Sequence, residues 1–372
     1  MRKPLIQDSA VKTAFLWTLA MRLFYSTIGA LAAPYLKLDP ALIRSNDLTD
    51  NLLTRDTGWT YRWLGVWERF DTLWYLHIAA HGYDRPDAVV FFPFYPLLIK
   101  LLGWPLRSPL LAALLISTVA SFFLLWGLQK LLSLDLPSET VRRTILLLLL
   151  WPSSFILFVG YPEALLLAFL IWAVYCARQQ RWWWAGVLGL LAGLTKAAGL
   201  CVIVPLAVLA WRKREWRAWP ISVSLLSPLL VTALIKVSGL PLASDAYPKH
   251  WRTEIAFPLV TLWASLHEVI TQHDAVLLLN LVALTVVFGA AFLKRLNWEY
   301  TLFALATLTL FLTKKTDPLL QSTNRYVLTV FPAFASLAIW LRHPLALALY
   351  LFLALLLNLA LLWSFFEWAL VV

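Results

Sequence analysis

Long apolar runs separated by short charged connections dominate this sequence, and they restrict its fold more than any motif does. Hydrophobic residues make up 61% of the 372 residues, whereas charged residues make up only 14%. A water-soluble chain of this length needs a larger share of polar residues to cover its surface. We therefore predict an all-α polytopic membrane protein that forms a single integral membrane domain over residues 1–372.

Apolar runs of about 15 to 25 residues are long enough to form membrane helices. Two of the runs, 182–195 and 198–211, are short for complete crossings. They flank the break Gly193-Leu-Thr-Lys-Ala-Ala-Gly199, so they could form a bent pair that reaches only part of the bilayer. In total we expect about eleven spans, at 13–34, 109–132, 144–160, 162–177, 182–195, 198–211, 219–238, 274–293, 298–313, 325–341 and 344–366.

The positions of Lys and Arg predict the orientation in the membrane. The positive-inside rule places basic loops, and with them the N-terminus, in the cytoplasm. Two long segments, 35–108 and 239–273, then face the other side. The net charge of +11 suits anionic lipid and this topology, so no nucleic-acid partner is expected. The basic residues in alternate loops are Arg2, Lys3, Lys12, Lys130, Arg142, Arg143, Arg178, Arg181, Arg212, Lys213, Arg214, Arg217, Lys294, Arg295 and Arg342.

The N-terminal run and the cysteines add to this interpretation. The apolar run after Lys12 continues for about 20 residues without a small-residue cleavage site, which is typical of a first span. Cys176 and Cys201 fall inside expected spans, and neither belongs to a metal-binding or disulfide pattern. With a composition rich in Leu and Trp and poor in Met, the chain is expected in a bacterial inner (plasma) membrane.

The first outer segment carries an acidic residue, Asp71, in an aromatic-rich stretch. Tryptophans recur there at near-helical spacing, which favours an amphipathic helix in the membrane interface. Its polar face would carry Glu68, Asp71 and Tyr75, which are three and four residues apart. A carboxylate at the mouth of a membrane cavity can act as a general base towards a substrate hydroxyl. The same carboxylate could instead pair with Arg69 or Arg55.

His77 and His81 lie four residues apart in the same stretch. That spacing would let them share a metal ion, with Asp71 or Asp84 as a third ligand. Histidines at this spacing also serve as hydrogen-bonding packing residues, and no second pair of ligands is visible. We therefore expect no required cofactor, and a divalent metal remains the alternative.

Four basic residues, Lys196, Lys314, Lys315 and Arg325, lie on the outer side and depart from the positive-inside pattern. Charges in such places near a bilayer often mark functional sites. Together they could bind one anionic group, and a lipid phosphate is the simplest candidate. Lys314 and Lys315 could alternatively extend into the interface from a helix end. Glu163 opens a span from the outer side, where a carboxylate suits either a helix N-terminus or the site.

Several of these residues belong to short motifs that resemble one known family. The main stretch runs from Phe70-Asp71 through Ile78-Ala79 and His81-Gly82-Tyr83 to Phe91-Phe-Pro-Phe-Tyr-Pro96. Weaker matches follow at Tyr161-Pro-Glu-Ala164, Leu194-Thr-Lys-Ala-Ala-Gly199 with Pro205, and Asn324-Arg325-Tyr326 before Phe331-Pro332. This pattern resembles the phosphatidylinositol-glycan class V mannosyltransferases and their bacterial relatives, within the polytopic GT-C glycosyltransferases.

The resemblance implies an enzyme that moves a sugar from a polyprenyl-phosphate carrier to an acceptor hydroxyl on the non-cytoplasmic side. Mannose is the family's default sugar, and the acceptor would be a glycolipid, a glycan or a protein. The family's loop aspartate corresponds to Asp71, and its basic residue corresponds to Lys196. Phe70 stands where Trp is usual. Lys196 stands where Arg is common, which keeps the charge but loses the bidentate fork.

On this basis Asp71 would take the proton from the acceptor hydroxyl while the sugar is displaced with inversion. Lys196 and Arg325, with Lys314 or Lys315, would stabilise the departing lipid phosphate. This reaction needs no nucleotide site, which fits the absence of a Gly-rich phosphate loop that follows a strand. The remaining candidates for substrate binding are Arg69, Tyr75, His77, His81, Tyr83 and Glu163.

Two other functions fit parts of the sequence. A transporter or flippase of polyprenyl-linked lipids would share the spans, the outer cations and the aromatic residues. It would also be expected to show internal repeats, and we find no convincing one. A ligase that transfers a whole lipid-linked glycan would use a larger donor, and segment 239–273 is too short to distinguish it from a monosaccharide transferase.

Overall fold

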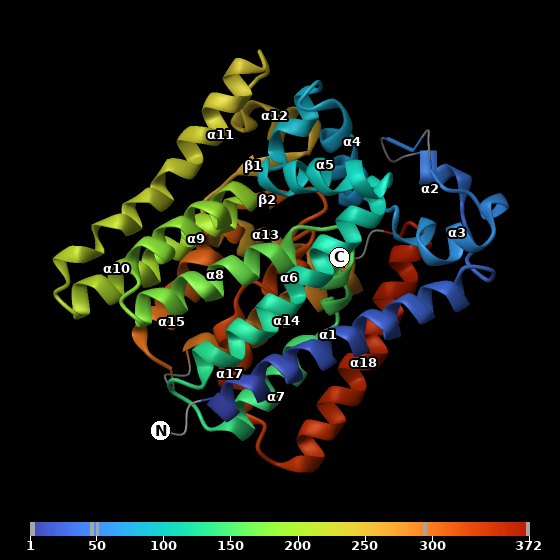
Figure 1. Ribbon diagram of the computed structural model, residues 1–372. Coiled ribbons are helices and arrows are strands. Elements are labelled where there is room, and N and C mark those ends of the chain that lie inside the picture. The colour runs from blue at the N-terminus through green and yellow to red at the C-terminus, as the bar shows by residue number, and fades with distance from the viewer. Residues whose placement is uncertain (1–3, 45–47, 50–51, 293–295, 370–372) are drawn as a thin grey trace.

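Helices form almost all of the regular structure in the computed structural model, which describes residues 4–44, 48–49, 52–292 and 296–369 (Figure 1). Elements named η are 3-10 helices. The chain begins with α1 (Pro4–Ala32), α2 (Pro40–Arg44), η1 (Arg55–Thr57), α3 (Trp59–Trp63), η2 (Gly65–Trp67), α4 (Asp71–His81), η3 (Pro86–Val90), α5 (Phe94–Leu106), α6 (Pro109–Leu132), α7 (Ser138–Leu149), η4 (Ser154–Phe158) and α8 (Glu163–Arg178). It continues with α9 (Trp182–Thr195), η5 (Ala197–Val202), α10 (Ile203–Arg212), η6 (Trp216–Leu225), α11 (Leu226–Val237), α12 (Ala243–His250), β1 (Thr253–Ile255), α13 (Pro258–Gln272), α14 (Ala275–Phe292), α15 (Trp298–Leu312), β2 (Lys314–Thr316), α16 (Thr323–Val327), α17 (Phe331–Trp340) and α18 (Pro344–Phe366).

Several helices are long and apolar enough to cross a membrane. Their exposed side chains include Phe15 and Leu23 on α1 and Phe352 and Leu356 on α18, which suit contact with lipid. The chain is therefore an integral membrane protein. Among the described residues there are five such segments, at Ser9–Ala32, Pro109–Leu132, Trp216–Val237, Ala275–Phe292 and Pro344–Phe366. The expected number of about eleven spans is not confirmed, because the remaining apolar helices are shorter.

Two of the expected spans, 144–160 and 325–341, are not continuous helices, so this part of the prediction is wrong. A break around Pro152 separates α7 from η4, because proline lacks a backbone donor and blocks helix continuation. A second break separates α16 from α17, which starts at Phe331 with Pro332 in its first turn. Backbone groups at these breaks are free to bind side chains.

The short spans expected at 182–195 and 198–211 are separated at Lys196. This residue has an extended backbone, with φ −164° and ψ 152°, and it lies between α9 and η5. Gly199 then brings the chain back against α9, since a Cβ atom there would lie only 2.1 Å from the carbonyl oxygen of Ala192. The close contact allows η5 to turn directly beside the end of α9.

Segment 35–108, the first segment expected on the outer side, forms several short helices instead of one amphipathic helix. The helical stretch is divided into α3, η2 and α4, and Phe70 has a left-handed φ of 49° directly before α4 begins at Asp71. Glu68 lies before this break, and its carboxylate accepts a hydrogen bond from the N–H of Leu53 at 2.7 Å. The expected common face of Glu68, Asp71 and Tyr75 is therefore wrong.

A two-stranded antiparallel ribbon joins the second outer segment to the chain that follows α15. In this ribbon Thr253 of β1 lies opposite Thr316 of β2, and Ile255 lies opposite Lys314. Figure 1 shows the ribbon at the same end of the molecule as α4, α5 and α12. Parts of both outer segments therefore meet at this end.

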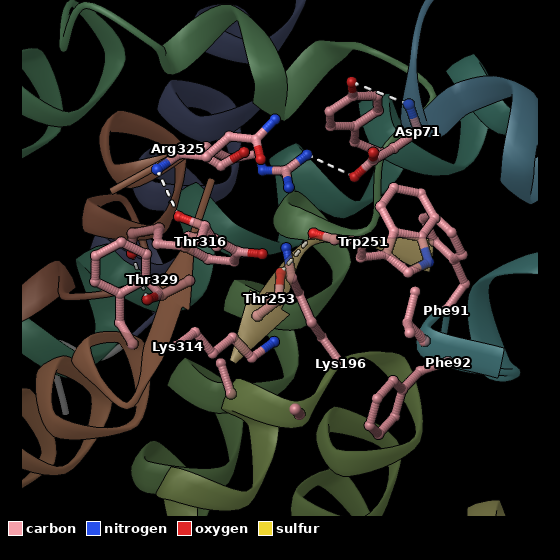
Figure 2. A pocket seen from close by; sticks show the side chains of 18 of the residues that line it. Asp71, Phe91, Phe92, Lys196, Trp251, Thr253, Lys314, Thr316, Arg325 and Thr329 are labelled. Atoms are coloured by element: carbon pink, nitrogen blue, oxygen red, sulfur yellow. Dashed lines mark hydrogen bonds and ion pairs between the residues drawn. The ribbon is translucent and has the colours of Figure 1, made fainter. Parts of the chain in front are cut away.

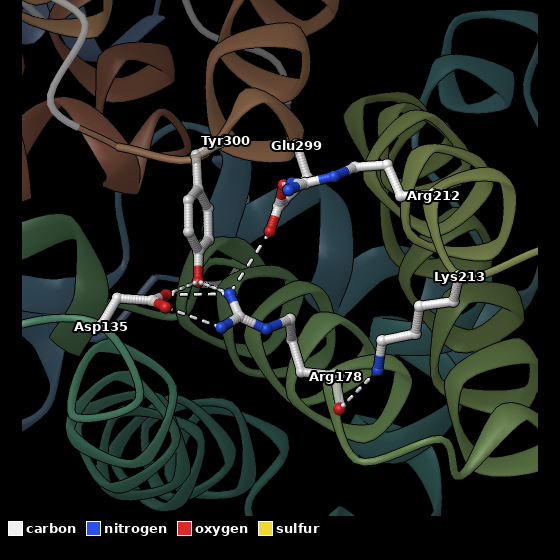
Figure 3. A network of polar contacts seen from close by, with 6 residues as sticks. All are labelled: Asp135, Arg178, Arg212, Lys213, Glu299 and Tyr300. Atoms are coloured by element: carbon white, nitrogen blue, oxygen red, sulfur yellow. Dashed lines mark hydrogen bonds and ion pairs between the residues drawn. The ribbon is translucent and has the colours of Figure 1, made fainter.

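An ion-pair network connects several helices at the C-terminal end of α8 (Figure 3). Arg178 pairs with Asp135 at 2.7 Å and with Glu299 at 3.3 Å, and Arg212 pairs with Glu299 at 2.9 Å. Lys213 donates a hydrogen bond to the carbonyl oxygen of Arg178. The network joins α8, α10 and α15 to the loop after α6. Of the basic residues expected on the cytoplasmic side, Arg2, Lys3, Lys294 and Arg295 lie outside the described residues.

Substituting Gly199 with alanine should destabilise the protein, because the new methyl group would collide with backbone atoms of α9. We expect a loss of about 1–3 kcal/mol in the free energy of unfolding. The matched control is Gly289→Ala in α14, where no atom lies within 4 Å of the added Cβ position. That change should be neutral or stabilising by about 0.5–1 kcal/mol. Thermal unfolding in detergent would measure both variants, and equal melting temperatures would contradict this account.

Candidate active site

A cavity of about 230 Å³ lies where the two outer segments meet (Figure 2). Its wall is formed by α4, η5, α15, α16, the β1–β2 ribbon and the loops beside them. Among the side chains that line it, the charged ones are Asp71, Lys196, Lys314 and Arg325. The structure thus brings one carboxylate and three cations together from segments that lie far apart in sequence.

Asp71 occupies the first position of α4, so its carboxylate starts from a helix N-terminus. Phe70, directly before it, has a positive φ of 49°, and the Asp71 backbone N–H donates a hydrogen bond to the Tyr161 hydroxyl at 3.3 Å. Its carboxylate Oδ2 lies 2.6 Å from Nη1 of Arg325. The alternative pairing of Asp71 with Arg69 or Arg55 is therefore not the one that forms.

Behind the cavity wall, Glu163 connects two of the cations. Its side chain is fully buried, and its Oε1 atom lies 2.6 Å from Nζ of Lys196 and 3.3 Å from Nε of Arg325. Together with Asp71, these contacts form a continuous chain of charges in the order Lys196, Glu163, Arg325 and Asp71. A buried carboxylate needs such partners, since an isolated charge is costly to remove from water.

The break before α17 places Arg325. The backbone carbonyl of Asn324 accepts hydrogen bonds from Ser153 at 2.5 Å and from the Trp151 indole at 3.3 Å. The Asn324 side chain donates to Asn280 at 2.7 Å. Trp151 and Ser153 belong to the other helix break, around Pro152, so the two interrupted segments hold each other. This arrangement fixes the backbone from which the Arg325 side chain extends towards Asp71.

Lys314 and Lys315 point in different directions because they are neighbours on the strand β2, where successive side chains alternate. Lys314 lines the cavity, and its Nζ lies 2.8 Å from the Tyr247 hydroxyl. Burial lowers the pKa of Lys314, but the nearby oxygens of Tyr247 and Tyr326 raise this pKa more, so it lies above its ordinary value. The ammonium group therefore stays charged at neutral pH. Lys315 is not among the residues that line the cavity.

The charges at the cavity do not cancel. The carboxylates of Asp71 and Glu163 face the cations Lys196, Lys314 and Arg325, which leaves one positive charge. Arg325 and Lys196 are each engaged by a carboxylate, whereas Lys314 donates a hydrogen bond to the hydroxyl of Tyr247. The surplus makes the cavity suitable for an anionic group, and Lys314 is the cation best placed to bind it.

Other expected site residues lie elsewhere. Arg69 is buried behind α4, where it donates to the backbone oxygens of Gly65, Glu68 and Phe366 at 2.9–3.1 Å. It therefore fastens the end of α18 to η2, a structural role that its position in the sequence did not indicate. Of the remaining candidates, Tyr75 lines the cavity.

His77, His81 and Tyr83 lie at the other end of α4 and do not line the cavity. His77 Nε2 lies 2.8 Å from Asp84, and His81 Nδ1 lies 3.2 Å from the His77 carbonyl. Tyr83 donates to the carbonyl oxygen of Phe91 at 2.5 Å. Within the described residues, no three His, Cys, Asp or Glu side chains are grouped so that they could hold a metal ion.

The cavity also contains residues that the sequence did not single out. Tyr161 and Tyr326 belong to the short motifs around Glu163 and Arg325, so their proximity could have been inferred from those motifs. Trp251 and Thr253 come from the second outer segment, which is held beside the cavity in part by the pairing of β1 with β2. No local sequence pattern predicts that pairing.

The similarity of this chain to known proteins lies in its fold. No protein-family model matches the sequence, and no curated protein is similar to it. The structure is similar to the crystal structure of ArnT from Cupriavidus metallidurans bound to undecaprenyl phosphate, with a TM-score of 0.51 and 12% identity. The match covers 95% of this chain and 76% of that one. The two structures therefore share an overall fold along most of this chain.

Replacing Glu163 with glutamine should destabilise the protein, because Lys196 and Arg325 would lose the buried negative charge between them. We expect a loss of about 3 kcal/mol in the free energy of unfolding. The control is Glu139→Gln, since Glu139 is exposed and pairs with Arg142 at the surface. It should change stability by less than about 1 kcal/mol. Thermal unfolding of both variants would test this, and a normal melting temperature for Glu163→Gln would contradict it.

Proposed function

We propose that this chain is a membrane glycosyltransferase that transfers a sugar from a polyprenyl-phosphate-linked donor to an acceptor hydroxyl. The observation that carries the proposal is the cavity in which Asp71 lies beside an excess of positive charge. The fold supports it, because the similar ArnT structure contains undecaprenyl phosphate. That ligand combines a long apolar chain with an anionic head, which suits a cavity with surplus cations in a membrane protein.

In the proposed reaction, the donor phosphate binds beside Lys314, with Lys196 and Arg325 adding positive charge. The acceptor oxygen attacks the anomeric carbon from the side opposite the phosphate and forms the new glycosidic bond. As the carbon–oxygen bond to the phosphate breaks, polyprenyl phosphate leaves with the electron pair, and the cations stabilise the charge that develops on it. Asp71 accepts the proton of the acceptor hydroxyl. A single displacement of this kind inverts the anomeric configuration.

The residues around Asp71 would serve this reaction by positioning. Arg325 contacts the carboxylate directly and fixes its orientation, and Glu163 holds Arg325 and Lys196 in turn. Tyr75 would form part of the substrate wall. No step in this mechanism uses a nucleotide or a metal ion.

The finer assignments follow the resemblance to the phosphatidylinositol-glycan class V mannosyltransferases and their bacterial relatives. They are mannose as the sugar, a glycolipid, glycan or protein as the acceptor, and the external face of a bacterial inner membrane as the place of reaction. The basic residues of the expected cytoplasmic loops support this orientation. Arg178 and Arg212 are at the end of α8 and α10 that lies away from the cavity.

Replacing Asp71 with asparagine should abolish turnover while keeping donor binding, because the amide cannot accept the hydroxyl proton. We expect the rate to fall by a factor of at least about 100. Asp84→Asn is the control, since Asp84 lies outside the cavity and pairs with His77. Sugar release would be measured for both variants, with radiolabelled undecaprenyl phosphate that is linked to mannose or to another neutral sugar. A variant at Asp71 that turns over normally would show that this carboxylate is structural.

The two neighbouring lysines of β2 offer a matched test of phosphate binding. Lys314→Gln should weaken the binding of undecaprenyl phosphate by about tenfold or more, because a charge-assisted contact is lost. Lys315→Gln should leave the dissociation constant nearly unchanged, since Lys315 does not line the cavity. Microscale thermophoresis in nanodiscs would give both constants. Equal losses in the two variants would contradict the assignment of the phosphate to this cavity.

A further inference from the structure

Beside the ion chain, the cavity has a second region whose wall is aromatic and uncharged. Trp74 and Phe91 are stacked, with ring centroids 5.4 Å apart and an interplanar angle of 13°. The Trp251 ring packs against both of them, at 5.3 Å from Trp74 and 5.4 Å from Phe91. Figure 2 shows Trp251 and Phe91 together on one side of the cavity, near Asp71. This cluster forms a rigid apolar wall beside the candidate base.

Trp251 is held in place by contacts that leave part of its side chain exposed. Its indole N–H donates to the carbonyl oxygen of Asp87 at 2.9 Å, which ties the second outer segment to the first. Its own carbonyl oxygen accepts from the hydroxyl of Thr253 at 2.8 Å. The side chain is only partly buried, unlike Trp74 and Phe91, which are 6% exposed. The ring is thus fixed in orientation and still borders the open cavity.

Uncharged polar side chains from other segments also line the cavity. Thr253 and Thr316 face each other across the β1–β2 ribbon, and both line the cavity with Gln321 and Thr329. The Thr316 hydroxyl oxygen accepts the backbone N–H of Gln321 at 3.2 Å. Hydroxyl groups of this kind can donate and accept hydrogen bonds, so they suit a ligand that carries several hydroxyl groups.

A pyranose ring matches both parts of this wall. Its C–H bonds form an apolar face that can pack on an aromatic ring, and its hydroxyl groups lie around the rim. Aromatic side chains provide large contact areas at low entropic cost, and a few polar groups then set the orientation. The charged side chains that line the cavity are Asp71, Lys196, Lys314 and Arg325, and the proposed reaction uses all four. None of them is left over for a charged substituent on the sugar.

We propose that Trp251 is the platform on which the sugar of the lipid-linked donor stacks, and that this sugar is a neutral pyranose. This inference rests on the proposed function, because the phosphate beside Lys314 places the attached sugar between Lys314 and Asp71. Thr253 and Thr316 then hydrogen-bond its hydroxyl groups. Trp251 binds and positions the sugar and takes no part in proton transfer.

The test compares the binding of two lipids that differ only in the sugar. The dissociation constants of undecaprenyl phosphate and of undecaprenyl phosphate-linked mannose, glucose or galactose would be measured in nanodiscs. Their ratio isolates the contribution of the sugar. In Trp251→Ala the gain in affinity that the sugar provides should fall by about fivefold to tenfold, while the dissociation constant of undecaprenyl phosphate alone stays the same. Unchanged binding of the sugar-free lipid also shows that the variant is folded.

Two further variants sharpen the comparison. Trp251→Phe keeps an aromatic face and should retain most of the sugar contribution. Trp263→Ala removes an exposed tryptophan from α13, outside the cavity, and should leave both affinities unchanged. An effect of Trp263→Ala equal to that of Trp251→Ala would overturn the proposal.

The outcomes separate this inference from the proposed function. If the ratio of the two dissociation constants, with and without the sugar, is the same in Trp251→Ala as in the wild type, the sugar platform is refuted and the transferase proposal stands. If only lipids that carry an amino sugar or a uronic acid bind more tightly than undecaprenyl phosphate, the assignment of a neutral sugar is refuted. If the wild type binds none of these lipids, both proposals fail.

Discussion

The buried carboxylate of Glu163 is the constraint on which the rest of the site depends. It lies between Lys196 and Arg325 in the interior of a membrane protein, where an unpaired charge would be very costly. The two cations must therefore converge on the first residue of α8, although one follows α9 and the other belongs to α16. Arg325 extends the chain to Asp71. The contacts that stabilise the interior thus also bring a candidate base next to an excess of cations.

Helix breaks make this convergence possible. Lys196 lies in the break between α9 and η5, and Arg325 follows the turn that leads into α16. The break around Pro152 supplies Trp151 and Ser153, which bind the backbone carbonyl of Asn324. Irregular backbone in a membrane protein is tolerated where it is buried in protein or lines a cavity. The long helices α1, α6, α14 and α18 remain as an apolar scaffold around these breaks.

Composition was sufficient to predict a helical membrane protein, and Asp71, Lys196 and Arg325 could be singled out from the sequence as candidate site residues. Their pairing could not, because it depends on where helices break. The separation of Lys314 from Lys315 depends on the alternation of side chains along β2. The position of Trp251 depends on the adjacent strand β1, which pairs with a strand about 60 residues away. Arg69 was expected to bind the substrate, but its guanidinium group donates hydrogen bonds to backbone oxygens. Long-range contacts of this kind leave no local trace in a sequence.

The most direct test is an experimental structure of the protein in nanodiscs with a phosphonate analogue of undecaprenyl phosphate-linked mannose, which cannot transfer its sugar. We expect the phosphonate to lie within hydrogen-bonding distance of Lys314 and the anomeric carbon to face the carboxylate of Asp71. We also expect the sugar to pack against Trp251. A lipid bound elsewhere on the helices, with the cavity between Asp71 and Lys314 empty, would contradict the central claim.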